Sequence, residues 1–314
     1  MSQKSDKFDE FASLFRSVVR PHLEVEPLSL DKLLVVLDVH SDPEKQNGIY
    51  QVAESMLNQF KPKLKLFCPV YSDTEVGQAQ EQLDALMKRL ESKDVELESE
   101  LRVCHPAGAI LREAENFGAD FLLIPSLFGE RDPELEGFTL GAVVDKVISN
   151  FRRPILLIEG DVPKVDELWA NILLFIEEVD GAEPCLAATR TLASKAAQAR
   201  MLHVIDAHML DVVARGLKVT TELETASASD ALASALKKDM DHYLEGAKEL
   251  LNRTGHRSSF EIQTGDPVEM VRQFIREHGP RLVVCNSVAP DERLVDSVAY
   301  NLAAYLREVP LLLV

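Results

Sequence analysis

Short apolar runs alternate with amphipathic stretches along most of this chain, and their order occurs twice. The run LLVVLDVH at 33–40 and the run ILLFIEEV at 172–179 both carry an acid near their ends, so that Asp38 matches Glu177. Nearly continuous apolar runs of this kind are typical of parallel strands that are buried on both faces. The repeated order indicates two copies of one α/β unit.

Two later stretches repeat in the same order. The matched segments are 105–126 with 266–287 and 147–158 with 303–314, which align Pro106 with Pro267, Gly118 with Gly279 and Pro154 with Pro310. In the first copy we expect strands at 33–38, 64–71, 97–103, 120–125 and 154–158, and helices at about 47–60, 74–92, 107–117 and 139–150. In the second we expect strands at 171–176, 200–206, 258–263, 281–286 and 310–314, and helices at 183–197, 267–278 and 293–307. Such alternation predicts doubly wound parallel sheets with right-handed crossovers.

The repeat divides the chain into an N-terminal extension at 1–29, a first domain at 30–160 and a second at 169–314, with a polar linker around 159–168. The extension carries one apolar helical stripe, formed by Phe8, Phe11, Phe15 and Val18. We expect this helix to pack on its own chain, and a partner-binding helix is the alternative.

The second copy is longer between its second and third strands, at about 208–255. Residues 228–255 read as a strong amphipathic helix that stops at Gly255. Insertions between regular elements often cover ligands, so this segment is our candidate lid over a cavity in the second copy, and additional packing is the alternative.

Charge and cysteine usage narrow the class of protein. The formal net charge of −18 argues against nonspecific nucleic-acid binding and against binding to anionic membranes. The four cysteines show no metal-ligand spacing and fit a reducing compartment. We find no bilayer-spanning apolar stretch and no secretory signal at the start, so we expect a soluble cytoplasmic protein.

The order of these elements, the acid after the first strand, the sequence GDP at 265–267 and the closing VPLLLV at 309–314 resemble the universal stress protein family. Two copies in one chain are similar to its tandem members, and the resemblance covers about residues 30–314. It implies two tandem doubly wound, mainly parallel five-stranded sheets of α/β class (adenine-nucleotide alpha-hydrolase-like), related by pseudo-twofold symmetry.

Members of this family form dimers through their last strands, so the resemblance implies that the two copies pair with each other inside this chain. The closing segments RRPILLI at 152–158 and EVPLLLV at 308–314 are short and apolar, and would otherwise leave open sheet edges. Pairing within one chain has a high effective concentration. Two separate domains on a linker are the alternative.

Some members of the family bind ATP through a glycine-rich loop after the fourth strand, in which backbone N–H groups hold the phosphates. The first copy keeps Asp38, Ser126, Gly129 and Gly141 for such a site, but Pro125 stands where the first glycine is expected. The following loop is rich in carboxylates, which repel a triphosphate. We therefore expect a degenerate nucleotide site and no obligatory cofactor, with ATP as the candidate ligand.

The corresponding loop of the second copy has no glycine, and its candidate ligand-pocket residues are Glu177, Asn286, Ser287 and Ser297. A P-loop, a dinucleotide-binding fingerprint and a nucleophile elbow are all absent from the sequence. His203, within an apolar run, is expected to be a hydrogen-bonded core residue, and we expect no metal site. These observations predict a non-enzymatic stress-response or regulatory binding protein whose partner or small ligand is unknown. An ATP-binding switch or weak ATPase in the first domain, and an assembly scaffold that uses the N-terminal helix, are the alternatives.

Overall fold

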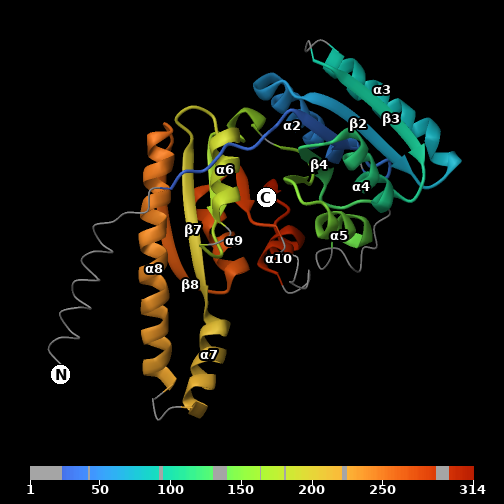
Figure 1. The fold of residues 1–314 in the computed structure, drawn as a ribbon. Coiled ribbons are helices and arrows are strands. Elements are labelled where there is room, and N and C mark those ends of the chain that lie inside the picture. Colours follow the sequence, from blue (N-terminus) through green and yellow to red (C-terminus); the bar gives the residue numbers. More distant parts are fainter. Residues whose placement is uncertain are drawn as a thin grey trace, which may run out of the picture.

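The computed structural model describes residues 23–41, 43–91, 95–129, 140–162, 164–179, 182–220, 225–287 and 297–314. The amphipathic segment at 6–19, the loop at 130–139 and the loop at 288–296 therefore lie outside the described residues. Within the described part, the strands and helices alternate as the apolar runs predict (Figure 1).

The strands are β1 (Lys32–Val36), β2 (Lys63–Val70), β3 (Leu97–Val103), β4 (Phe121–Pro125), β5 (Ile155–Ile158), β6 (Asn171–Phe175), β7 (Gln198–Asp206), β8 (Arg257–Gly265), β9 (Leu282–Cys285) and β10 (Leu311–Leu313). They form one sheet in the order β3-β2-β1-β4-β5-β10-β9-β6-β7-β8. The second half thus repeats the strand order of the first half from the opposite edge. Neighbouring strands are parallel within each half, and the halves meet through the antiparallel pair β5–β10.

The two five-stranded sheets expected from the sequence form one ten-stranded sheet through this central pair. Leu312 of β10 lies opposite Leu156 of β5 in the register, so the two closing strands do pair, as the sequence predicted. The pairing joins the sheets into one, because each strand supplies the backbone hydrogen bonds that the edge of the other half lacks. Only β3 and β8 are edge strands of the described sheet.

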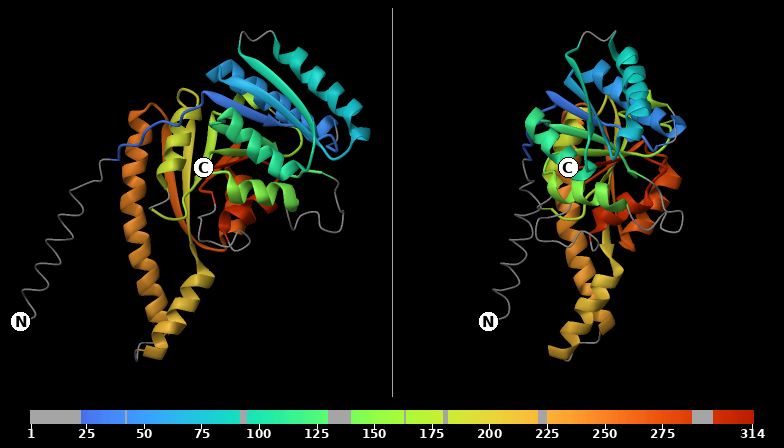
Figure 2. Two further views of the ribbon diagram at one scale, coloured as in Figure 1. Left: turned by 45° about the vertical axis from the view of Figure 1, so that its right-hand side comes forward. Right: turned by 90° about the vertical axis from the view of Figure 1, so that its right-hand side faces the viewer.

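The helices are α2 (Pro43–Phe60), α3 (Val76–Leu90), α4 (Pro106–Phe117), α5 (Gly141–Asn150), α6 (Ala182–Leu192), α7 (Ala207–Thr220), α8 (Thr225–Arg253), α9 (Pro267–His278) and α10 (Val298–Tyr305), with 3-10 turns η1 (Asp73–Glu75) and η3 (Val165–Glu167). Helices α2, α3, α6 and α8 share one apolar core with one face of the sheet. Helices α4, α5, α9 and α10 share the other. Each core runs through both halves. Figure 2 shows the sheet and its helices from two further sides.

The helix boundaries differ from the predictions where local hydrogen bonds intervene. The helix expected at 183–197 ends at Leu192, since the Ser194 N–H donates to the carbonyl of Trp169 and Ala196 has a positive φ. Gly118 and Gly279, which match in the two copies, both adopt the left-handed conformation that ends α4 and α9. The two copies therefore share the same glycine conformation at the carboxyl ends of α4 and α9.

Residues 23–30, which we call the strap, connect the start of the described chain to β1 by crossing the second half. The Leu28 N–H donates to Thr191 Oγ1 at 2.8 Å, and the Arg190 guanidinium donates to the carbonyl of Val25. Val25 is buried in the core that α6 shares with the sheet. Figure 1 shows this segment passing across α6 toward α8, so the strap lies against the second half.

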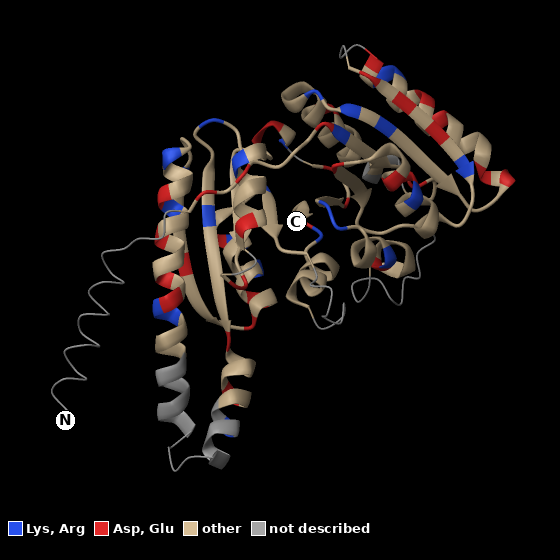
Figure 3. Ribbon diagram, in the orientation of Figure 1, with Lys and Arg blue, Asp and Glu red and all other residues tan. Residues whose placement is uncertain are grey.

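The extra segment of the second half forms two helices, and α8 corresponds to the helix predicted at 228–255, with α7 preceding it. Both extend beyond the edge of the sheet (Figures 1 and 2). Charged residues recur along α3 and along the described part of α8, as the colours of Figure 3 show, which is typical of helices with a solvated face. Gly255, just after α8, has a positive φ and supports the predicted stop.

The four cysteines are free, and Cys68, Cys185 and Cys285 are buried. None of the helices in the described ranges combines the length and apolar character that spanning a membrane needs. Across the same ranges, no group of three or more His, Cys, Asp or Glu side chains is arranged to hold a metal ion.

Candidate functional site

In the first half, the predicted site residue Asp38 is fully engaged by its own chain. It follows β1, where the strand order reverses between β1 and β4 and where ligands of open α/β sheets usually bind. Asp38 Oδ2 accepts hydrogen bonds from the Gly129 N–H at 3.0 Å and from Ser41 Oγ at 3.1 Å, while Oδ1 accepts from the His40 N–H at 3.1 Å. The loop after β4 is thereby tied to the end of β1.

Burial raises the pKa of Asp38, and its hydrogen bonds to the Gly129 and His40 amides and to the Ser41 hydroxyl oppose that rise. The side chain is only 2% exposed. Since the Gly129 amide already donates to a carboxylate, it is not available to a phosphate in this arrangement. The geometry of Asp38 and Gly129 is that of a loop anchor.

Aromatic and imidazole rings lie beside this anchor. Tyr71, which follows β2, lies with its ring centroid 6.2 Å from that of His40 and 6.1 Å from that of His105. A Cβ atom on Gly129 would meet the Tyr71 hydroxyl at 3.4 Å. The His105 side chain precedes α4 but accepts no capping hydrogen bond from it, whereas its counterpart Asp266 caps α9 by accepting from the Glu269 N–H. These rings therefore lie beside the anchor at the carboxyl edge of the first half, where Tyr71 remains 44% exposed.

The other predicted residues of the first half contribute backbone structure. Ser126 is buried, and its N–H donates to the carbonyl of Ile158 at 2.9 Å. Pro125 ends β4 opposite Ile158. Gly141 opens α5 with a φ of +81°, and the space around the Cβ that it lacks is open. The structure therefore brings Asp38 and Gly129 into contact, whereas Ser126 and Gly141 hold the ends of the adjoining elements.

The second half has an apolar pocket of about 550 Å³ at the carboxyl ends of β6 and β7. Helices α7 and α8 contribute Met209, Leu210, Val213, Leu236 and Met240, and the remaining lining includes Phe175, Val179, Val204, Ile205, Pro267 and Val298. Met209 is 57% exposed and Leu236 is 45% exposed, so apolar side chains also surround the mouth. The predicted lid segment therefore does line a cavity in the second half.

The polar groups of this pocket are acidic or neutral. Its carboxylates are Glu177, Glu178, Asp206 and Asp239, and the lining that the structure describes contains no Lys or Arg. His203 is buried with Nδ1 2.8 Å from the Ile176 carbonyl, which can only accept, so Nδ1 carries the proton. Burial lowers the pKa of His203 and keeps the ring neutral. The pocket is suited to an apolar ligand without negative charge.

Of the residues predicted for the second ligand pocket, Glu177 lines this cavity. The others lie in different environments. Asn286 Oδ1 accepts from Cys185 Sγ at 3.0 Å, the Ser287 N–H donates to the carbonyl of Val314, and Ser297 is buried and caps α10 through the Tyr300 N–H. The sequence could not single out Met209 or Leu236, because apolar positions of an amphipathic helix look alike until their neighbours are known.

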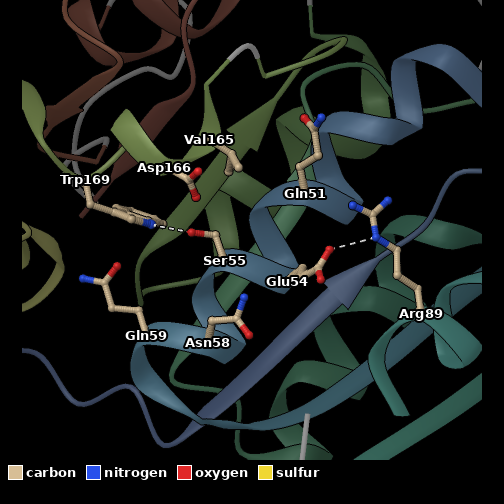
Figure 4. A pocket seen from close by; sticks show the side chains of 9 residues that line it. All are labelled: Gln51, Glu54, Ser55, Asn58, Gln59, Arg89, Val165, Asp166 and Trp169. Carbon is tan, nitrogen blue, oxygen red and sulfur yellow. Dashed lines mark hydrogen bonds and ion pairs between the residues drawn. The ribbon is translucent and has the colours of Figure 1, made fainter. Parts of the chain in front are cut away.

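A second cavity, of about 450 Å³, lies between α2, α3 and η3 and is polar (Figure 4). Its α2 side consists of Gln51, Glu54, Ser55, Asn58 and Gln59, and the remaining lining is Arg89, Val165, Asp166 and Trp169. Trp169 Nε1 donates to Ser55 Oγ at 3.0 Å, and Arg89 Nε donates to Glu54 at 2.9 Å. These bonds join α2 to the interdomain segment and to α3, which indicates a structural role.

Residues 32–159 match the model described as the Universal stress protein family. The match begins at β1 and ends just after β5, so the first half is the part of the chain that is similar to this family. A search of curated proteins found no matching sequence.

Solved structures extend the likeness of the fold to most of the chain. A universal stress protein from Archaeoglobus fulgidus DSM 4304 is 14% identical with a TM-score of 0.62, and the match covers 91% of this chain and 98% of that one. A protein of unknown function from Pseudomonas aeruginosa PAO1 is 15% identical with a TM-score of 0.58, covering 91% of this chain and 92% of that one. At these identities the comparison establishes the fold alone.

Proposed function

We propose that this chain is a tandem member of the universal stress protein family, most like universal stress protein E, and that it acts as a non-enzymatic binding protein in a cytoplasmic stress response. The repeated strand order and the β5–β10 pairing support an intrachain pseudo-dimer with pseudo-twofold symmetry. The free thiols in the described part of the chain support a reducing compartment. In this proposal the two domains span residues 30–160 and 169–314.

The pocket of the second half carries the proposal. It joins a mostly apolar lining to a rim of carboxylates, so its ligand is a small apolar molecule that is neutral or cationic. The nucleotide site of the first half has become a structural anchor, since Asp38 binds the Gly129 amide. In this proposal the first half holds the fold together while the second half binds the ligand.

Two probes test the proposal. Nile red, which is neutral and apolar, is expected to bind with increased fluorescence and to raise the melting temperature. A ligand present at one hundred times its Kd stabilises the fold by about 2.7 kcal/mol. Mg-ATP at millimolar concentration is expected to produce no shift. A shift with Mg-ATP that Asp38→Ala removes, without Nile red binding, would favour the ATP switch instead.

A further inference from the structure

The polar side chains in the wall of the second-half pocket can accept hydrogen bonds but have none left to donate. The described lining contains the imidazole of His203 and the carboxylates of Glu177, Glu178, Asp206 and Asp239. Ionised carboxylates only accept, and His203 already donates its ring proton to the carbonyl of Ile176. A ligand that matches this lining therefore supplies the donors itself.

His203 places an acceptor without a partner inside the pocket. Its side chain lines the cavity and is only 7% exposed, three residues before the end of β7. Within the described ranges, its Nε2 atom has no hydrogen-bond partner. Burial lowers the pKa of His203, so Nε2 carries a lone pair rather than a proton at neutral pH. A buried acceptor without a partner destabilises the site, and a donor on a ligand removes that cost.

We propose that the ligand of this pocket is a hydrophobic amine, whose protonated amino group donates to His203 Nε2 and is attracted by the surrounding carboxylates. This inference rests on the proposed function and narrows its ligand from a neutral or cationic molecule to an ammonium ion with an apolar body. The apolar side chains of the lining surround that body. The cavity volume of about 550 Å³ lies within the range of about 300–1,000 Å³ that is usual for drug-sized ligands.

Charge distinguishes an ammonium ion from other donors. An alcohol can also donate to His203, but the lining that the structure describes has four carboxylates and no Lys or Arg. These carboxylates favour a cation over a neutral molecule and repel an anion. The apolar side chains around them strengthen the attraction, because a low dielectric constant reduces screening. A quaternary ammonium ion has the charge but no N–H to donate.

The first experiment compares four ligands that carry the same length of carbon chain and displace Nile red from the full-length protein. They are decylamine, decyltrimethylammonium, 1-decanol and decanoate, which differ in charge and in the ability to donate. Decylamine is protonated at neutral pH, as lysine is. It should bind at least about tenfold more tightly than decyltrimethylammonium or 1-decanol, because its hydrogen bond has a charged donor, and decanoate should bind most weakly.

The second experiment repeats the comparison with variants of the pocket. His203→Phe removes the acceptor and keeps an aromatic ring, so the Kd values of decylamine and decyltrimethylammonium should become similar. Asp239→Asn should weaken decylamine binding about threefold relative to 1-decanol, since one exposed carboxylate is lost. Asp241→Asn is the matched control, because Asp241 is also exposed on α8 but is not part of the described lining. It should leave the ratio of the two Kd values unchanged.

The outcomes separate the two proposals. If neither Nile red nor any of the four ligands binds, the proposed apolar pocket is wrong and this inference falls with it. If Nile red binds but decylamine and 1-decanol bind equally, or decanoate binds best, the pocket stands and the amine is wrong. Equal binding of decylamine and decyltrimethylammonium to the wild type would overturn the contact with His203. The wild-type ranking decides the proposal even where His203→Phe does not fold.

Discussion

The two halves of this molecule have the same strand order but use the carboxyl edge of the sheet in opposite ways. In the first half, Asp38 binds the loop after β4 and Tyr71 occupies the space beside it. In the second half, the corresponding ends of β6 and β7 line an apolar cavity of about 550 Å³. A repeated fold therefore places equivalent strand ends at corresponding positions, while a few side chains determine the chemistry at each of them.

The inserted helices account for much of this difference. The second half inserts α7 and α8 between β7 and β8, and both helices line the pocket. The first half has only α3 and the short turn η1 between β2 and β3, and Tyr71 instead lies against the loop at Gly129. The two halves therefore differ in the side chains that lie over the equivalent strand ends, those of β1 and β2 in the first half and of β6 and β7 in the second.

The largest expected effect tests how tightly the first half is packed. A Cβ atom at Gly48 of α2 would lie 2.0 Å from the carbonyl oxygen of Gly160. Gly48→Ala should therefore lower the free energy of unfolding by about 3 kcal/mol, because backbone must move to relieve the overlap. Gly77→Ala in α3, where no heavy atom lies within 4 Å, is the matched control and should be neutral or slightly stabilising. Equal results from urea denaturation would refute close packing at Gly48.

The next prediction compares the two acids that match in the repeat. Asp38→Ala should destabilise the fold by about 2 kcal/mol, since it leaves the Gly129 and His40 amides without their acceptor. Glu177→Ala, at an exposed position, should change stability by less than about 0.5 kcal/mol. Thermal and urea unfolding measure both variants. A similar loss of stability in both variants would contradict the view that Asp38 anchors a loop whereas Glu177 only lines the pocket.

Two adjacent valines of α7 test whether the probe binds in the pocket of the second half. Val213 lines the cavity and Val212 does not, although both are exposed on the same helix. Val213→Trp should weaken Nile red binding about tenfold, or about 1.4 kcal/mol, by occupying space that the probe needs. Val212→Trp should leave binding unchanged. Equal loss in both variants would place the probe elsewhere on α7.

The smallest effect concerns the pH dependence of the second half. The pKa of His203 is depressed in the folded state, so the unfolded chain takes up the proton first as the pH falls. Its contribution is therefore complete above about pH 6.5 and is lost as the pH falls from there through the folded-state pKa. Between pH 7.5 and pH 5.5 the wild type should lose up to about 1 kcal/mol relative to His203→Gln, since the pocket leaves the ring partly solvated. The free energy of unfolding is measured with urea at each pH. The same pH dependence in the wild type and in His203→Gln would contradict the prediction.

The sequence by itself determined most of the element order, because strands buried on both faces must be continuously apolar. It also marked Asp38 and Glu177 as equivalent and placed a lid candidate between the second and third strands of the second copy. These are local or repeated signals, and their physical cause lies within a few residues of each position.

Only the tertiary structure decided what the equivalent positions do. The sequence gives Asp38 the same place as Glu177, but the positive-φ turn at Gly129 brings an amide to Asp38. Likewise, Met209 and Leu236 belong to different helices and line one pocket only because α7 and α8 fold back over β6 and β7. A single continuous sheet also arises from contact between the two ends of the repeat. Such outcomes depend on distances between residues far apart in the chain, which no periodicity within one segment records.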